Sequence, residues 1–152
     1  MKQVADILRT KGHAVWCTQP DSSVFDALKL MAEKDVGALV VTEGTRPVGI
    51  FSERDYARKV ILAGRTSPNT RVREIMSDKV IYVQPETTIP ECMALMTQER
   101  VRHLPVIVND ELVGVVSIGD VVKDIITDQD MEIRQLENYV LGRGYSADPL
   151  QL

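Results

Sequence analysis

The sequence predicts a mixed α/β (α+β) protein made of two β-α-β-β-α units packed with pseudo-two-fold symmetry. The first observation is a repeat, since "ALVVTEGTRPVGIFSERD" at 38–55 returns as "HLPVIVNDELVGVVSIGD" at 103–120. The second is a constant spacing between matched residues, which form the pairs Pro20/Pro85, Gly49/Gly114, Ser52/Ser117 and Asp55/Asp120. Repetition at a fixed spacing indicates one supersecondary unit built twice. A unit of this size buries little surface alone, so we expect both to share one globule.

The first unit begins with a short strand at 15–17, followed by a turn that contains proline. A helix comes next, because its apolar residues have the spacing i, i+3, i+4, i+7: Val24, Ala27, Leu28 and Met31. Ser and Asp three residues apart, at 23 and 26, predict a capping box at the start of this helix. Two β-rich runs, 38–42 and 47–52, and a last helix at 53–63 complete the unit.

The second unit repeats this order, with a short strand predicted at 80–83. Its first helix has the same apolar spacing: Ile89, Cys92, Met93 and Met96. Thr and Glu at 88 and 91 predict the matching capping box. The β-rich runs 104–108 and 112–117 lead into a last helix at 118–127.

Three segments lie outside the two repeated units. "VADIL" at 4–8 resembles "VREIM" at 72–76, but the spacing is longer by three residues, which we place near 10–14. The stretch 64–71 is a linker, 130–142 is an additional amphipathic helix, and 143–152 is a loose tail. We therefore divide the chain into unit 1 with the N-terminal helix (1–66), unit 2 (67–128), and a C-terminal helix with tail (129–152).

Composition narrows the classes of function. The chain has 44% hydrophobic and 26% charged residues and a formal net charge of −4, which argues against general binding to nucleic acid or an anionic membrane. No apolar run is long enough for a membrane span, and the N-terminus lacks the apolar centre of a signal peptide. Cys17 and Cys92 form no C-x-x-C pair, so we expect free thiols, no metal and a cytoplasmic location.

The repeated motif also resembles a known family. "GIFSERD", "GVVSIGD" and "VRHLPVI", occurring together in a tandem repeat, resemble the CBS domain. The resemblance covers Val4 to Ile126, and the chain is similar to free-standing bacterial proteins that consist of a CBS pair and little else. It implies that the clefts between the two units bind adenosine compounds such as AMP, ADP, ATP, S-adenosylmethionine or NAD.

The resemblance also implies roles for the residues of the S-x-x-D motif. The Asp accepts hydrogen bonds from the two ribose hydroxyls, which suits a group that has only acceptors. The Ser hydroxyl and the N–H groups at the start of the following helix face phosphate, because a helix N-terminus attracts anions.

Carried onto this chain, the family's residues form two sites composed across the repeat. The first site comprises Ser52, Glu53, Arg54, Asp55, Ile81, Arg102 and His103, with Arg58 and Lys59 as further phosphate partners. The second comprises Ser117, Ile118, Gly119, Asp120, Trp16, Gly37 and Ala38. Ile81 and Trp16 would flank the adenine. The first site has more cations, so we expect it to prefer ligands with more phosphate, and the second to accept AMP or a less charged compound.

Each of these assignments has a simpler alternative. Ser52 with Asp55 is also an ordinary helix start, Arg58 and Lys59 suit a charged helix surface, and Trp16 suits packing. At the level of the whole protein, the alternative is a constitutive interaction module with degenerate clefts. An enzyme that hydrolyses nucleotides is a weaker hypothesis, because the sequence lacks G-x-S-x-G, H-E-x-x-H and Walker A motifs.

The expected function is therefore regulatory rather than enzymatic. Ligand would shift the population between arrangements of the two units and so change affinity for an unidentified regulated protein. We also expect a homodimer, through the matched stripes Val24/Leu28/Met31 and Ile89/Met93/Met96, because a two-fold interface needs a self-complementary patch.

Overall fold

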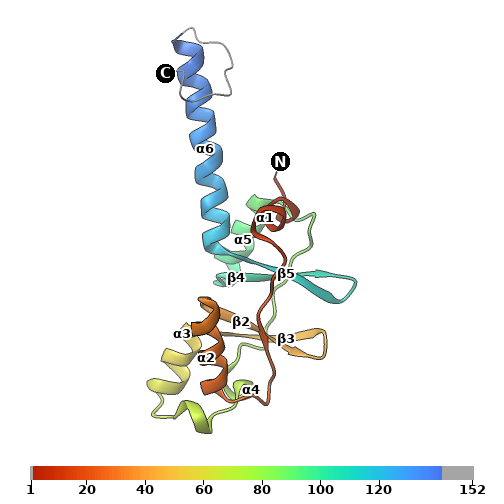
Figure 1. The fold of residues 1–152 in the computed structure, drawn as a ribbon, viewed down its shortest axis with the longest axis vertical. Coiled ribbons are helices and arrows are strands. Elements are labelled where there is room, and N and C mark those ends of the chain that lie inside the picture. The colour runs from red at the N-terminus through yellow and green to blue at the C-terminus, as the bar shows by residue number, and fades with distance from the viewer. Residues whose placement is uncertain (1, 142–152) are drawn as a thin grey trace.

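A computed structural model describes residues 2–141 and confirms the mixed α/β fold (Figure 1). One sheet contains β1 (Cys17–Thr18), β2 (Ala38–Glu43) and β3 (Arg46–Ser52) in that order, with β1 parallel and β3 antiparallel to β2. The other sheet pairs β4 (His103–Val108) with β5 (Glu111–Ser117) in antiparallel register. The strand expected at 80–83 is absent as a strand and is reduced to a single parallel bridge between Val83 and Val106.

The first helix of each unit follows the predicted apolar spacing. These helices are α2 (Val24–Lys34) and α5 (Ile89–Glu99). Each begins with one cap hydrogen bond, from the backbone N–H of Asp26 to Ser23 Oγ and from that of Glu91 to Thr88 Oγ1. The reciprocal capping boxes lie instead at the S-x-x-D motifs, where each Asp also accepts from the Ser backbone N–H.

The short helices α1 (Val4–Lys11) and α4 (Val72–Ile75) are exchanged between the units. Val4 and Leu8 of α1 pack in the core of the second unit, and α4 packs in the core of the first. Backbone hydrogen bonds from Val4 N to Thr87 O and from Val24 N to Thr70 O hold this arrangement. The sequence analysis places α1 in the first unit. The spacing of apolar residues shows that one face of a helix is buried, but it does not show which core buries that face.

The repeated glycines make room for the exchanged helices. A Cβ added at Gly114 would lie 2.8 Å from Leu8 Cδ2. A Cβ at Gly49 would lie 2.7 Å from Met76 Sδ, directly after α4. Leu8 and Met76 are matched residues of the two upstream segments, so each glycine accepts the same packing from the opposite end of the repeat.

The apolar stripes of α2 and α5 are not a dimer face. Val24, Met31, Ile89 and Met96 are all buried in the cores of their own chain. The expectation of a homodimer through these stripes was wrong in its choice of surface, because the sheets of the same chain already cover them. Met93 is the one stripe member with a largely exposed side chain.

The two units end differently. In the first, α3 (Glu53–Tyr56) continues as a π-helical segment, η1 (Ala57–Ile61). In the second, α6 (Ile118–Val140) is one helix of 23 residues that leaves the globule (Figure 1). The sequence analysis predicts two separate helices in this region, at 118–127 and 130–142. The structure has one helix, because no glycine or proline interrupts the chain between 120 and 141. The tail expected at 143–152 lies outside the described residues.

Candidate functional site

The first S-x-x-D motif places a carboxylate where β3 meets α3. Asp55 Oδ2 accepts hydrogen bonds from Ser52 N and Ser52 Oγ, both at 3.0 Å, and the backbone N–H of Asp55 donates to Ser52 Oγ at 3.2 Å. Asp55 Oδ1 has one cationic partner, Lys59 Nζ, at 3.3 Å. The motif is therefore a helix cap, as the simpler alternative expected, and also holds one carboxylate oxygen toward the surface.

A cavity of about 500 Å³, which we call the Asp55 cleft, lies beside this motif. The predicted residues of the first site that line it are Ser52, Glu53, Arg54, Asp55, Arg58, Lys59, Ile81, Arg102 and His103. Gly37, assigned to the second site, also lines it. The cleft joins α3 of the first unit to β4 of the second, so its composition across the repeat is as the sequence predicted.

The lining of the Asp55 cleft is strongly cationic. It contains six basic side chains and only two acidic ones: Arg54, Arg58, Lys59, Lys79, Arg100 and Arg102 against Glu53 and Asp55. The four arginines form no ion pair with another of residues 2–141. Lys79 is engaged by Glu99 at 2.7 Å. Sequence reasoning missed Lys79 and Arg100, although alignment of Arg100 with Asp35 would have marked this arginine as unique to this side.

The second S-x-x-D motif repeats the cap but has a different cation. Asp120 Oδ2 accepts from Ser117 N at 2.9 Å, and the backbone N–H of Asp120 donates to Ser117 Oγ at 3.1 Å. The same Oδ2 accepts from Lys11 Nζ at 2.6 Å, and Lys11 also donates to Val115 O at 2.8 Å. Burial would raise the pKa of Asp120, but the hydrogen bonds from Lys11 and Ser117 outweigh it and hold this pKa below its ordinary value.

Lys11 divides the second predicted site into two cavities. The inner one, of about 360 Å³, contains the predicted Trp16, Gly37, Ala38 and Ser117, together with Lys11, Asp35 and His103. We call it the Asp120 cleft, after the motif beside it. Asp120 itself lines the neighbouring cavity, and Ile118 and Gly119 line neither. The second site is thus less completely assembled than the first, because the end of α1 lies across it.

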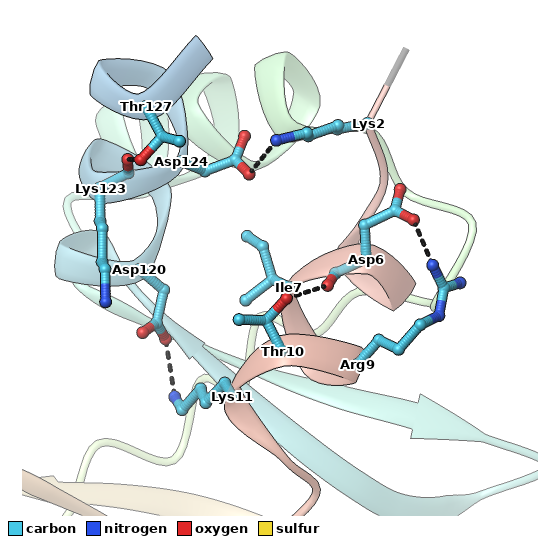
Figure 2. A pocket seen from close by; sticks show the side chains of 10 residues that line it. All are labelled: Lys2, Asp6, Ile7, Arg9, Thr10, Lys11, Asp120, Lys123, Asp124 and Thr127. Atoms are coloured by element: carbon cyan, nitrogen blue, oxygen red, sulfur yellow. Dashed lines mark hydrogen bonds and ion pairs between the residues drawn. The ribbon is translucent and has the colours of Figure 1, made fainter. Parts of the chain in front are cut away.

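The neighbouring cavity, of about 670 Å³, lies between α1 and α6 (Figure 2). Its acidic side chains are each engaged by a cation, and the pairs are Asp6–Arg9 at 2.9 Å, Asp120–Lys11 at 2.6 Å and Asp124–Lys2 at 3.1 Å. Figure 2 shows these pairs around the side chain of Ile7. All three carboxylates of this cavity therefore have a cationic partner within the chain, and among its basic side chains Lys123 alone forms no ion pair with another described residue.

Two aromatic rings lie in the clefts. Trp16 is partly exposed, and Lys34 Nζ lies 4.4 Å from its ring centroid, an intramolecular cation–π contact. His103 lines both clefts. Burial lowers the pKa of His103, and the nearby charges of Lys11 and Arg102 lower it further against the opposing effect of Asp120. The shift favours the neutral form of His103, the residue with an ionisable ring that lines both clefts.

Neither cysteine is an exposed, activated thiol. Cys92 is buried and Cys17 half-buried, and both are free. Burial, reinforced by Glu91, raises the pKa of the Cys92 thiol to about 11, and burial also raises that of Cys17. Among residues 2–141 we find no group of three or more His, Cys, Asp and Glu side chains that could hold a metal ion. Within the same residues, every helix is too short or too polar to cross a membrane.

Two repeated units with a carboxylate-bearing cap beside each cleft define a tandem-repeat module of the regulatory binding type. The model of the CBS domain matches residues 3–61 and 72–127. The chain belongs to the CBS-domain family, as the motifs predicted.

Solved structures and relatives agree with this assignment. A CBS-domain protein from Burkholderia ambifaria MC40-6 is 51% identical, with a TM-score of 0.81, over 84% of this chain and 96% of that one. The mitochondrial CBS domain-containing protein CBSX3 of Arabidopsis thaliana is 43% identical over 93% of this chain and 73% of its own length. The CBS pair of MJ0100, solved with 5′-methylthioadenosine and S-adenosyl-L-methionine, has a TM-score of 0.72 over 82% of this chain and 99% of its own, but only 21% identity, so it shows the fold alone.

Proposed function

We propose that this chain is a regulatory module that binds an adenosine nucleotide, of the AMP, ADP, ATP or NAD type, in the Asp55 cleft. The proposal rests on one observation. The Asp55 cleft contains the Asp55 carboxylate together with four arginines, and these arginines have no ion-pair partner among the described residues. A carboxylate accepts from two neighbouring hydroxyls, as a ribose offers. Arginine donates two parallel hydrogen bonds to phosphate.

The dimensions of the Asp55 cleft support a small-molecule ligand. Its volume of about 500 Å³ falls within the range of roughly 300–1,000 Å³ that small-molecule sites occupy. Ile81 offers an apolar surface for the base, on the opposite unit from Asp55. The CBS pair of MJ0100 binds two adenosine compounds, which makes an adenosine ligand compatible with this fold.

Regulation would follow from the position of the ligand between the units. Asp55 and Arg58 belong to the first unit, whereas Arg102 and His103 belong to the second. A ligand that contacts both units stabilises the arrangement in which both sets of contacts form, and it can shift the equilibrium only by that difference in affinity. The regulated partner would be a protein that distinguishes the two arrangements.

The alternative, a constitutive interaction module, is favoured by one observation and only for the second cleft. Lys11 donates to Asp120 Oδ2 there, so this oxygen already has a charged partner from another helix before any ligand binds. We infer that the Asp120 cleft binds adenosine compounds more weakly than the Asp55 cleft and must displace Lys11 to do so.

The remaining parts of the proposal concern setting and partners. A cytoplasmic location suits two free, inert thiols. The module would act by binding rather than by catalysis. A homodimer also belongs to the proposal, through a surface other than the buried stripes of α2 and α5.

The test is a direct search for the ligand. Small molecules released from the purified protein would be identified by mass spectrometry, and AMP, ADP, ATP and NAD would then be titrated by calorimetry. We expect at least one of them to bind, and Asp55→Ala to weaken that binding. Absence of binding by all four nucleotides, with the fold intact by circular dichroism, would overturn the proposed function.

A further inference from the structure

The outer half of α6 carries an apolar stripe that the described chain leaves uncovered. Positions spaced alternately by four and three residues form the stripe, which we call the α6 seam: Val122, Ile126, Gln129, Ile133, Leu136 and Val140. Five of these six side chains are apolar, and their exposed fractions rise from 44% at Val122 to 79% at Val140. This spacing is the heptad pattern by which helices pair.

Part of the seam lies where no other described part of the chain packs against it. Ile133, Leu136 and Val140 line a shallow hollow on the part of α6 that extends beyond the globule (Figure 1). A helical segment of this length is only marginally stable in water without tertiary packing. Contiguous exposed apolar surface on an otherwise charged helix marks an interaction site.

We propose that the α6 seam binds the seam of a second copy of this chain, with the two helices antiparallel. When two copies are aligned about Met131, Val122 lies opposite the partner's Val140 and Ile126 opposite the partner's Leu136. Every seam position then meets another seam position. A two-fold axis repeats each contact twice, which is the rule for a symmetric dimer.

The charges beside the seam select the antiparallel direction. The row next to it carries Lys123 near the globule and Glu137 near the tip. Antiparallel pairing places Lys123 opposite the partner's Glu137, and does so twice. In a parallel pair Glu132 would instead face the partner's Glu137, and like charges repel. Asp130 and Glu132 lie near the two-fold axis and meet their own copies, a smaller repulsion that the two Lys–Glu pairs offset.

The first experiment is sedimentation of the full chain at micromolar concentration. We expect a dimer, and we expect Leu136→Glu to weaken association at least about tenfold, because it buries two charges in the apolar seam. Met131→Glu is the matched control, since Met131 is also more than half exposed, 53% against 64% for Leu136, and lies on the opposite face of α6. A monomeric wild type, or a dimer indifferent to Leu136→Glu, would overturn the proposal.

A charge exchange tests the direction of the pair. Lys123→Glu and Glu137→Lys should each weaken the dimer about three- to tenfold, and the double variant should restore it. A parallel pair would respond differently, because Glu137→Lys alone would then tighten the dimer by facing Glu132. Far-UV circular dichroism verifies that all variants remain folded. Failure of the double variant to recover affinity would reject the antiparallel arrangement.

Discussion

The Asp55 and Asp120 clefts have the same scaffold but differ in charge: the first is strongly cationic, and the second has one lysine and one aspartate in its lining. Both carboxylates cap a helix, accept from the Ser three residues earlier and have a lysine within 3.3 Å. Asp55 takes its lysine from the following turn of the same helix, whereas Asp120 takes Lys11 from α1. Six cations line the Asp55 cleft, and Lys11 is the one basic lysine or arginine among the described residues that line the Asp120 cleft. The repeated residues thus form the same cap in both units, and the residues that do not repeat give the two clefts a different charge.

The largest expected effect would break the equivalence of the two carboxylates. Asp55→Ala should weaken ATP binding by about 1.5–3 kcal/mol, since it removes a charged acceptor for two hydroxyls. Asp120→Ala is the matched control and should leave ATP affinity within about twofold. Calorimetric titration of both variants measures the difference. Equal losses in the two variants would show that the clefts are equivalent for ATP.

Removal of Lys11 should make the Asp120 carboxylate more available to a ligand. In the Asp55→Ala background, where the second cleft reports alone, Lys11→Ala should raise AMP affinity by about fivefold. The reason is that a ligand no longer has to displace an ion pair worth up to about 1 kcal/mol. Lys123→Ala serves as the control. Lys123 lines the neighbouring cavity together with Lys11, and it forms no ion pair with another described residue. Unchanged AMP affinity after Lys11→Ala would mean that Lys11 does not block the cleft.

Salt should separate the clefts by a smaller margin. ATP binding to Asp120→Ala protein reports the Asp55 cleft, and AMP binding to Asp55→Ala protein reports the Asp120 cleft. Between low and physiological ionic strength, affinity should fall a few-fold more in the Asp55 cleft, because more charge is neutralised there. To remove the difference in ligand charge, ATP should also be titrated into both variants. Identical salt slopes with ATP would rule out the electrostatic asymmetry.

The smallest effect is on stability and depends on pH. The pKa of Asp120 is lower in the folded protein than in the unfolded chain, so its ionised form contributes stability above the unfolded pKa. That contribution, under about 1 kcal/mol for a partly exposed pair, is lost as pH falls through the folded pKa. The gap in urea midpoint between wild type and Asp120→Asn should therefore be present at neutral pH and close in acid. A gap that widens in acid would contradict this sign.

The sequence predicted the repeated parts well and the exchanged parts poorly. Matched motifs at constant spacing were enough for the two units. The residues of the first site came from the resemblance to the CBS domain, and all of them line the Asp55 cleft, while their role in binding stays a prediction. Lys11 was missed because it lies near the three-residue insertion at 10–14, where the alignment of the two copies is not defined. The strand at 80–83 was overestimated, since strand pairing depends on tertiary register rather than on local pattern. The absence of glycine and proline between 120 and 141 predicts a single helix there, whereas the end of the repeat near 127 predicted two.

The exchange of α1 and α4 has a consequence for the order in which the chain matures during synthesis. α1 leaves the ribosome before the other described helices, but its core partners extend to Val121. At roughly 5–20 residues per second, α1 waits on the order of 5–20 s for them. α4, in contrast, emerges when α2 and β3 are already available. The nascent chain therefore completes its first core before its second, and the helix made first is buried last.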